Sequence, residues 1–217
     1  MQTSSRHLDY YERLRQLDRP AALEVVEDFL AQGGEIEGLY TEILIPALML
    51  AGEDWEADRI SVAHEHFISE VTRDLIYRYG PQMWSQTNSS LPVTVACCAP
   101  GERHSLGLLM ICDLLRACGL SVFSLGEGAP AEAVRDFVSQ ANAQWLCLSV
   151  ALSLHLPEAR DLIELARLAR PNLKVLAGGA AFEGQSERAL AIGADHFAND
   201  LRDLRRQLPE LLRESIR

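Results

Sequence analysis

The residues best suited to chemistry stand in a short loop that follows an apolar run. This loop, Gly101–Gly107, reads GERHSLG. An imidazole binds a metal through one ring nitrogen when its other nitrogen donates to an acceptor, and Glu102 stands two residues before His104 as such an acceptor. Gly107 leaves room for a bulky group near the start of the next helix. The loop predicts a metal or cofactor site on His104, with a plain strand-to-helix turn as the alternative.

Two later positions are expected at the same edge of the fold. Ser149 ends the third apolar run of this part of the chain, where its hydroxyl can join the hydrogen-bond chain of the histidine loop. Gly178-Gly179 ends the fourth run. Without side chains, these glycines let a large planar ligand or its tail pass close to the backbone.

A second cluster lies nearer the amino terminus. Trp55 is followed, after nine residues, by Glu65-His66. The alternative to a functional role is a helical hairpin with a buried tryptophan. Glu65 and His66 are not expected to act as an acid–base pair, because adjacent helical side chains point roughly 100° apart. The sequence contains no P-loop, no HExxH motif and no evident nucleophile–base pair, so we do not expect an enzyme.

Helical periodicity dominates residues 1–84, which we expect to form a four-helix bundle. A first helix is expected at about 5–17, and a second begins at Arg19-Pro20 and ends at Gly33-Gly34. A third carries an apolar stripe from Ile36 to Leu48, and a fourth extends from about Ser61 to Tyr79. Short turns between such helices favour antiparallel packing.

The polar segment 85–92 ends in Pro92 and is interpreted as a linker to an α/β domain at 93–217. Short apolar strands alternate there with helices, which predicts a doubly wound parallel sheet of the flavodoxin-like or Rossmann-like kind. Ligands of such sheets lie beyond the carboxyl ends of the strands. The expected strands are Val93–Cys98, Ser121–Leu125, Trp145–Val150, Leu173–Ala177 and one near His196; the expected helices are Ser105–Cys118, Pro130–Asn142, Leu156–Ala169, one from about Gln185, and Leu201–Ile216.

Composition limits the partners. The 217 residues carry a formal net charge of −11, which opposes direct binding to nucleic acid. The five cysteines show no zinc spacing and are expected as small core residues in a reducing compartment. The first residues, MQTSSRHLDYYERLRQL, do not resemble a signal peptide, and no apolar run is long enough to span a membrane. We therefore expect a cytoplasmic protein with no membrane partner.

The α/β part resembles the cobalamin-binding domain family over about residues 93–200. The shared pattern is Glu102-x-His104-x-x-Gly107, Ser149-x-Ala151 and Gly178-Gly179, together with Leu125-Gly126, Pro130 and Gly193-Ala194-Asp195. Ala151 departs from the leucine of the family. The resemblance implies a base-off, His-on cobalamin, with His104 as the lower axial cobalt ligand and the nucleotide tail beside the glycines. It implies cofactor contacts for Glu102, Arg103, His104, Ser105, Gly107, Leu125, Ser149, Ala151, Ser153, Gly178 and Gly179.

The helical part extends this resemblance. A bundle before the sheet domain is typical of the family and caps the upper face of the cofactor. Trp-x9-Glu-His resembles the signature of CarH-type light-dependent B12 regulators, which implies that Trp55, Glu65 and His66 surround a 5′-deoxyadenosyl group. Glu56 stands where that group has a histidine that binds cobalt after photolysis. CarH proteins also have an amino-terminal DNA-binding domain, whereas this sequence starts beside the bundle, like the stand-alone AerR/PpaA-type antirepressors.

Three functions follow from the resemblance. The first is a cobalamin light sensor and transcriptional regulator without its own DNA-binding domain, which signals to a transcription factor or other regulatory protein after Co–C photolysis. Adenosylcobalamin or methylcobalamin is the expected dark cofactor and hydroxocobalamin the product, and a homo-oligomer is compatible with this function. The second is a corrinoid methyl carrier for a methyltransferase system, whose members favour Asp at position 102. The third is a haem sensor in which His104 binds iron.

Overall fold

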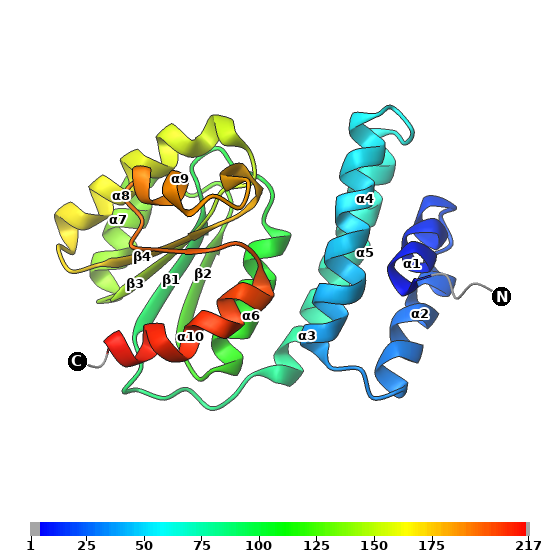
Figure 1. The fold of residues 1–217 in the computed structure, drawn as a ribbon, viewed down its shortest axis with the longest axis horizontal. Helices are drawn as coiled ribbons and strands as arrows, with labels where there is room; N and C mark the ends of the chain where they lie inside the picture. Colours follow the sequence, from blue (N-terminus) through cyan, green and yellow to red (C-terminus); the bar gives the residue numbers. More distant parts are fainter. Residues whose placement is uncertain (1–4, 216–217) are drawn as a thin grey trace. The chain divides into compact units, whose positions relative to one another are not determined.

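The computed structural model describes residues 5–215, and these divide into two compact units with a boundary between Met83 and Trp84. The first unit is entirely helical in its described part, as the periodicity predicted (Figure 1). Its longest element is the 18-residue helix that begins beside Glu65 and His66. Its elements are α1 (Arg6–Arg15), α2 (Arg19–Ala31), α3 (Ile36–Gly38), the π-helix η1 (Leu39–Leu44), α4 (Ile45–Glu56), α5 (Val62–Tyr79) and the 3-10 helix η2 (Gly80–Met83).

The third helical stretch of the first unit contains an irregularity that the sequence did not predict. Pro46 lies in the first turn of α4, where it has no amide hydrogen and where its ring would clash with a regular preceding turn. The wider π-turn of η1 directly before it accommodates the ring. The helix then continues to Glu56, well past the predicted apolar stripe, so Trp55 lies in its last turn.

Buried polar contacts hold the α4–α5 hairpin to α1. The Tyr10 hydroxyl lies 3.1 Å from the Thr72 hydroxyl, and the Tyr11 hydroxyl donates to the Asp54 carboxylate. The other Asp54 oxygen accepts from Arg59 Nε at 2.6 Å, and the Asp54 carbonyl accepts from the Arg59 amide at 2.7 Å. The Tyr11 hydroxyl and the Arg59 guanidinium together lower the pKa of Asp54. The turn between Trp55 and Glu65 is therefore fixed by a charged, well-bonded aspartate.

The second unit contains a five-stranded sheet, and all four of its strand pairings are parallel. The strand order β2-β1-β3-β4-β5 is that of the flavodoxin-like fold, which confirms the predicted doubly wound architecture. The strands are β1 (Val93–Cys98), β2 (Ser121–Gly126), β3 (Trp145–Ser149), β4 (Lys174–Gly178) and β5 (His196–Ala198); the helices are α6 (Leu106–Ala117), α7 (Ala131–Gln140), α8 (Leu156–Ala169), α9 (Ser186–Ala191) and α10 (Leu201–Ser215), with 3-10 turns η3 (Ser153–His155) and η4 (Ala180–Phe182).

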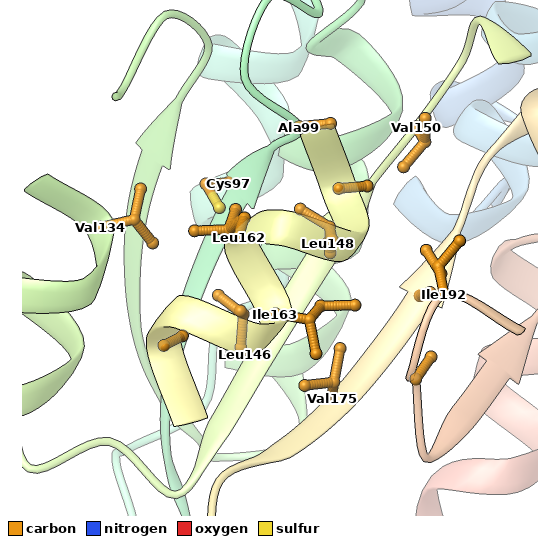
Figure 2. Close-up of a cluster of buried hydrophobic side chains, with 14 of the residues drawn as sticks. Cys97, Ala99, Val134, Leu146, Leu148, Val150, Leu162, Ile163, Val175 and Ile192 are labelled. Atoms are coloured by element: carbon orange, nitrogen blue, oxygen red, sulfur yellow. The ribbon is translucent and has the colours of Figure 1, made fainter. Parts of the chain in front are cut away.

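Alternation along the strands divides their side chains between two faces. Figure 2 shows the face covered by α7 and α8, where Leu146, Leu148 and Val150 pack against Leu162 and Ile163. On the other face, Cys147 and Ser149 point toward α6 and α10. Burial on both faces explains why the central strands read as unbroken apolar runs.

The carboxyl-terminal helix α10 is amphipathic. Leu201, Leu204, Leu208 and Leu211 are buried, and arginines occupy much of the remaining surface. Ile216, where this helix was predicted to end, lies outside the described residues. Among the residues that the structure describes, we find no helix that is both long and apolar enough to cross a membrane.

Candidate cofactor-binding site

The histidine loop lies at the switch point of the sheet. β1 and β3 are neighbours, but the connection from β1 leads outward to β2 while the connection from β3 leads the other way to β4. In doubly wound folds, ligands bind in the crevice that opens at the carboxyl ends of two such strands. The loop after β1 carries Glu102 and His104, and the segment after β3 carries Ala151 and Leu152.

Glu102 joins these two segments. Its side chain is fully buried. One carboxylate oxygen accepts from the Arg103 amide at 2.9 Å, from the His104 amide at 3.0 Å and from His104 Nδ1 at 2.5 Å. The other accepts from the amides of Ala151 and Leu152, both at 2.9 Å. Five N–H groups from two loops therefore converge on one carboxylate.

These contacts determine the form of His104. Burial alone would raise the pKa of Glu102, but the hydrogen bonds from His104, Leu152 and Ala151 lower it to about 2. An ionised carboxylate only accepts hydrogen bonds, so the proton of the imidazole must sit on Nδ1. The lone pair of Nε2 is then free to bind a metal, and the side chain of His104 is 59% exposed.

Gly101 and His155 shape the start of the loop. Gly101 has a φ of +87°, in the left-handed region that favours glycine. A Cβ at this position would lie 3.0 Å from Cε1 of the His155 ring. The imidazole of His155 therefore packs on the backbone at Gly101, and the β3 loop contacts the β1 loop at a second point.

The predicted role of Ser149 is wrong in one respect. Within residues 5–215, no hydrogen bond joins its hydroxyl to Glu102 or His104; the backbone amides of Ala151 and Leu152 take that place. A backbone contact does not depend on the side chain, so alanine in place of the family's leucine at 151 leaves it intact. Ser149 itself is buried at the end of β3, and its carbonyl accepts from the Ala99 amide at 3.0 Å.

The three glycines of the predicted site, Gly107, Gly178 and Gly179, divide into two kinds. A Cβ at Gly178 would lie 2.9 Å from the Ala198 carbonyl oxygen, and one at Gly179, where φ is +117°, would lie 2.2 Å from that of Val150. The chain's own packing therefore requires these two glycines, and the passage of a ligand beside them stays a prediction. By contrast, a Cβ at Gly107 would meet nothing within 4 Å. Gly107 leaves open space beside the start of α6, which suits a bulky ligand over His104.

The remaining predicted contact residues lie around the same edge. Arg103 is exposed, Ser105 is buried directly before α6, and Leu125 is half-buried near the end of the edge strand β2. The Ser153 hydroxyl donates to the Ala181 carbonyl at 3.4 Å. Below the edge, a cavity of about 10 Å³ lies between α6, α10 and the strands, with Ser149 and Gly178 in its wall. It has room for about one water molecule, so a nucleotide tail would have to widen it.

Gly193-Ala194-Asp195 has a structural role. One Asp195 oxygen accepts from the Val175 amide and from Arg167, both at 2.7 Å, and Arg167 also donates to the Gly193 carbonyl at 2.8 Å. These contacts tie α8 and β4 to the turn before β5.

In the helical unit, Trp55 and the Glu65-His66 pair stand at the two ends of one hairpin turn. The Trp55 side chain is 46% exposed, so the alternative interpretation of a buried tryptophan is wrong. The argument that Glu65 and His66 point apart is also wrong, because Glu65 accepts from His66 Nδ1 at 2.6 Å. Glu65 also accepts from the Ser69 hydroxyl at 2.7 Å. Rotation about the side-chain bonds brings these adjacent groups together at the start of α5.

Sequence reasoning missed the amide of Leu152 and the place of His155 against Gly101. An amide leaves no trace in residue identity. A histidine six residues after the end of β3 is a visible signal, and the strand ends bring it to the edge that carries His104.

The fold and the loop define an α/β domain with an exposed imidazole, held by a buried carboxylate, at its switch point. Comparison with known proteins specifies the class. A model described as "B12 binding domain" matches residues 92–201, and a second model of the same description matches residues 8–78. The chain therefore belongs to the B12-binding domain family.

Two kinds of relative are similar to this chain. The HTH-type transcriptional repressor CarH of Myxococcus xanthus is 31% identical over 165 residues, which are 76% of this chain and 54% of that repressor. This chain thus spans about half the length of CarH. Dimethylamine corrinoid protein 1 of Methanosarcina acetivorans is 28% identical over 198 residues, which are 87% of this chain and 83% of that protein.

A solved structure shares the fold over most of its length. The monomethylamine corrinoid protein of Methanosarcina barkeri superposes with a TM-score of 0.81 and covers 93% of this chain and 96% of its own. Its sequence identity is 18%, so this likeness concerns the fold alone.

Proposed function

We propose that this chain is a cobalamin-dependent light sensor that regulates transcription through contact with another protein. In this proposal His104 binds cobalt from below, and Trp55, Glu65 and His66 contact the upper ligand. A bound alkylcobalamin would supply a cobalt–carbon bond that light breaks. The helical residues would exclude water from the upper ligand and change their packing once it leaves.

The observation that carries the proposal is the exposed indole of Trp55. Tryptophan is among the side chains that gain most from burial, and large aromatic side chains exposed at one end of an element commonly serve contacts with a ligand or partner. Here Trp55 is 46% exposed in the last turn of α4, next to a turn fixed by Asp54. The similarity to CarH, a transcriptional repressor, supports the same choice.

The geometry below the cofactor fits the proposed group. His104 presents Nε2 while the buried Glu102 holds Nδ1, and Gly107 leaves space beside the helix start. Arg103, Ser105, Leu125, Ser149, Ala151 and Ser153 are proposed to line the remainder, with Gly178 and Gly179 forming the backbone of the edge. An imidazole hydrogen-bonded to a carboxylate is a more basic metal ligand than a free imidazole.

The second candidate is a corrinoid methyl carrier that serves a methyltransferase. It is supported by the dimethylamine corrinoid relatives, which match this chain over most of both lengths. In that function, the upper ligand would be a methyl group delivered to a partner enzyme. Glu rather than Asp at position 102 and the exposed Trp55 favour the sensor.

One set of spectra distinguishes these functions. The chain is mixed in the dark with adenosyl-, methyl- and hydroxocobalamin, and absorption and particle size are recorded before and after green light. His104→Ala should abolish the His-on spectrum, while the matched control His7→Ala in α1 should retain it. Trp55→Ala should weaken the preference for adenosylcobalamin, while Tyr77→Ala, another exposed aromatic residue of the helical unit, should leave it unchanged.

Each outcome of these measurements supports one of the two candidate functions or refutes both. No binding of any cobalamin would refute both candidates. Binding without a light-dependent change in size or partner affinity, together with methyl transfer to a methyltransferase, would favour the carrier. Light-dependent change that requires Trp55 supports the sensor. The regulatory partner, expected to be a transcription factor, is then sought with the dark and illuminated forms.

A further inference from the structure

Trp84, the first residue of the second unit, is held by two side chains of α6. Its indole Nε1 donates to the Asp113 carboxylate at 2.8 Å. The Arg116 guanidinium lies over the indole ring, 4.8 Å from its centroid, where a cation–π attraction operates. Arg116 also lies 3.7 Å from Asp113 and donates to the Val122 carbonyl at 3.0 Å. We call Trp84, Asp113 and Arg116 the Trp84 clamp.

The residues after Trp84 are fastened to the same helix end. The Ser85 hydroxyl donates to the Ala117 carbonyl at 2.8 Å, and the Ser85 amide to the Arg116 carbonyl at 3.3 Å. The Asn88 amide donates to the Gly119 carbonyl at 2.8 Å. The segment 85–92, interpreted as a linker, thus contains no helix or strand, but residues 85–88 are hydrogen-bonded to the end of α6. We call residues 85–88 the strap.

Chain connectivity gives this attachment its importance. α5 carries Glu65 and His66 in its first turn, and η2 continues it to Met83, directly before Trp84. α6 begins two residues after His104 and contains both partners of Trp84. Its twelve residues form a rod about 18 Å long. The chain that continues from α5 therefore enters the second unit at Trp84, whose side chain is held by the helix that follows the proposed lower ligand.

We propose that the Trp84 clamp positions the helical unit for cofactor recognition: it sets where α5 leaves the sheet domain, and so whether Trp55, Glu65 and His66 reach a ligand held by His104. Trp84, Asp113 and Arg116 are positioning residues that do not touch the cofactor. The proposal rests on the proposed function for its ligand readout only. The other part of the proposal, that Trp84 keeps the strap bonded to α6, can be measured without any cofactor.

The contacts allow Trp84 to be removed without dismantling α6. Asp113 is buried, but it keeps Arg116 nearby, and Arg116 keeps the Val122 carbonyl. Trp84→Ala therefore loosens the strap and leaves the helix its own polar contacts. Trp84→Phe retains a ring under Arg116 but cannot donate to Asp113, so it should be intermediate. Tyr77→Ala is the matched control for loss of an exposed aromatic ring just before the junction.

The test uses the full chain in two measurements. In the absence of cobalamin, hydrogen exchange at the Ser85 and Asn88 amides should be faster by roughly tenfold or more in Trp84→Ala, with unchanged exchange in β1 and β3. With cobalamin, the ratio of affinities for adenosylcobalamin and hydroxocobalamin should fall by roughly fivefold or more, a usual size for coupling between separate sites. The His-on spectrum should persist in Trp84→Ala and in Trp84→Phe.

Unchanged exchange at Ser85 and Asn88 in Trp84→Ala would overturn the clamp. So would a loss of the His-on spectrum, because Trp84 would then merely support the fold of α6. Faster exchange with an unchanged affinity ratio would overturn its positioning role. A wild-type chain with no preference for adenosylcobalamin would instead refute the proposed function; the exchange rates would then still decide whether the strap depends on Trp84.

Discussion

Replacing Glu102 by glutamine removes the charge that holds His104 and the two loops together, while keeping nearly the same side-chain shape. The carboxylate accepts five N–H groups, three on one oxygen and two on the other. An amide has only one acceptor atom. In either orientation its NH2 group faces N–H donors, from the His104 side or from Ala151 and Leu152. Leaving buried donors unsatisfied costs about 1–3 kcal/mol each, so we expect Glu102→Gln to destabilise the chain by about 2–4 kcal/mol.

The same substitution alters the imidazole. A glutamine NH2 opposite Nδ1 of His104 favours the tautomer with its proton on Nε2, and that nitrogen can then no longer bind cobalt. Loss of such a supporting carboxylate typically lowers metal affinity by about 10–100-fold. Two measurements test the expectation: denaturant unfolding of the cofactor-free chain, and titration with hydroxocobalamin followed by absorption.

Glu102→Asp is the matched control. It keeps the charge, and the family pattern accepts Asp at this position, but the side chain is one methylene shorter. It should retain His-on binding with a smaller loss of stability. If Glu102→Gln unfolds at the wild-type denaturant concentration and binds hydroxocobalamin with wild-type affinity, the reasoning from the five N–H groups is refuted.

Three further predictions follow from the same geometry. Because hydrogen bonds lower the pKa of Glu102 from 4.5 to about 2, its contribution of about 3 kcal/mol should be complete above pH 4.5 and disappear as pH falls toward 2; acid unfolding of Glu102→Gln should lack this component. Gly179→Ala should destabilise the cofactor-free chain by about 3 kcal/mol or more, since its Cβ would lie 2.2 Å from the Val150 oxygen; an unchanged melting temperature would contradict this. Gly107→Ala should increase the free energy of unfolding of the cofactor-free chain by up to about 1 kcal/mol, measured as a higher melting temperature. The same substitution should weaken cobalamin binding in an absorption titration. Unaltered cobalamin affinity would show that the space beside Gly107 is unused.

The fold was predictable because its elements are marked locally. Each central strand is an apolar run buried on both faces, and Gly, Pro or polar residues bound most of them, so alternation with helices was sufficient for the doubly wound class. The π-turn at 39–44 was not predictable from periodicity. Pro46 sits inside a stretch whose apolar spacing is helical throughout, and only the three-dimensional clash with the preceding turn requires the wider helix.

The contacts of the candidate site were also predictable only where they are local in the sequence. The contact between Glu102 and His104 is between residues two apart, so spacing was enough to predict it. The contacts from Glu102 to Ala151 and Leu152 span 49 and 50 residues. They use backbone amides, which every residue but proline possesses, so no residue type reports them. Gly178 and Gly179 show the converse: their identity was informative, but it did not reveal that contact with the chain's own carbonyl groups also requires glycine at both positions.

All the contacts that hold Glu102 and His104 lie within the second unit, and under the proposed function this bears on where a signal can arise. Glu102 is buried, ionised and bonded to both loops of the switch point, so the orientation of His104 is set before any cofactor binds. A rigid lower anchor is equally suited to a sensor and to a methyl carrier, and it cannot distinguish between them. The distinction must come from what touches the upper ligand. In the proposed function that is the hairpin with Trp55, Glu65 and His66, and the chain from this hairpin enters the second unit at Trp84. Substitutions at Glu102 should therefore change cobalamin affinity for every upper ligand alike, whereas substitutions at Trp55 or Trp84 should change the preference among upper ligands.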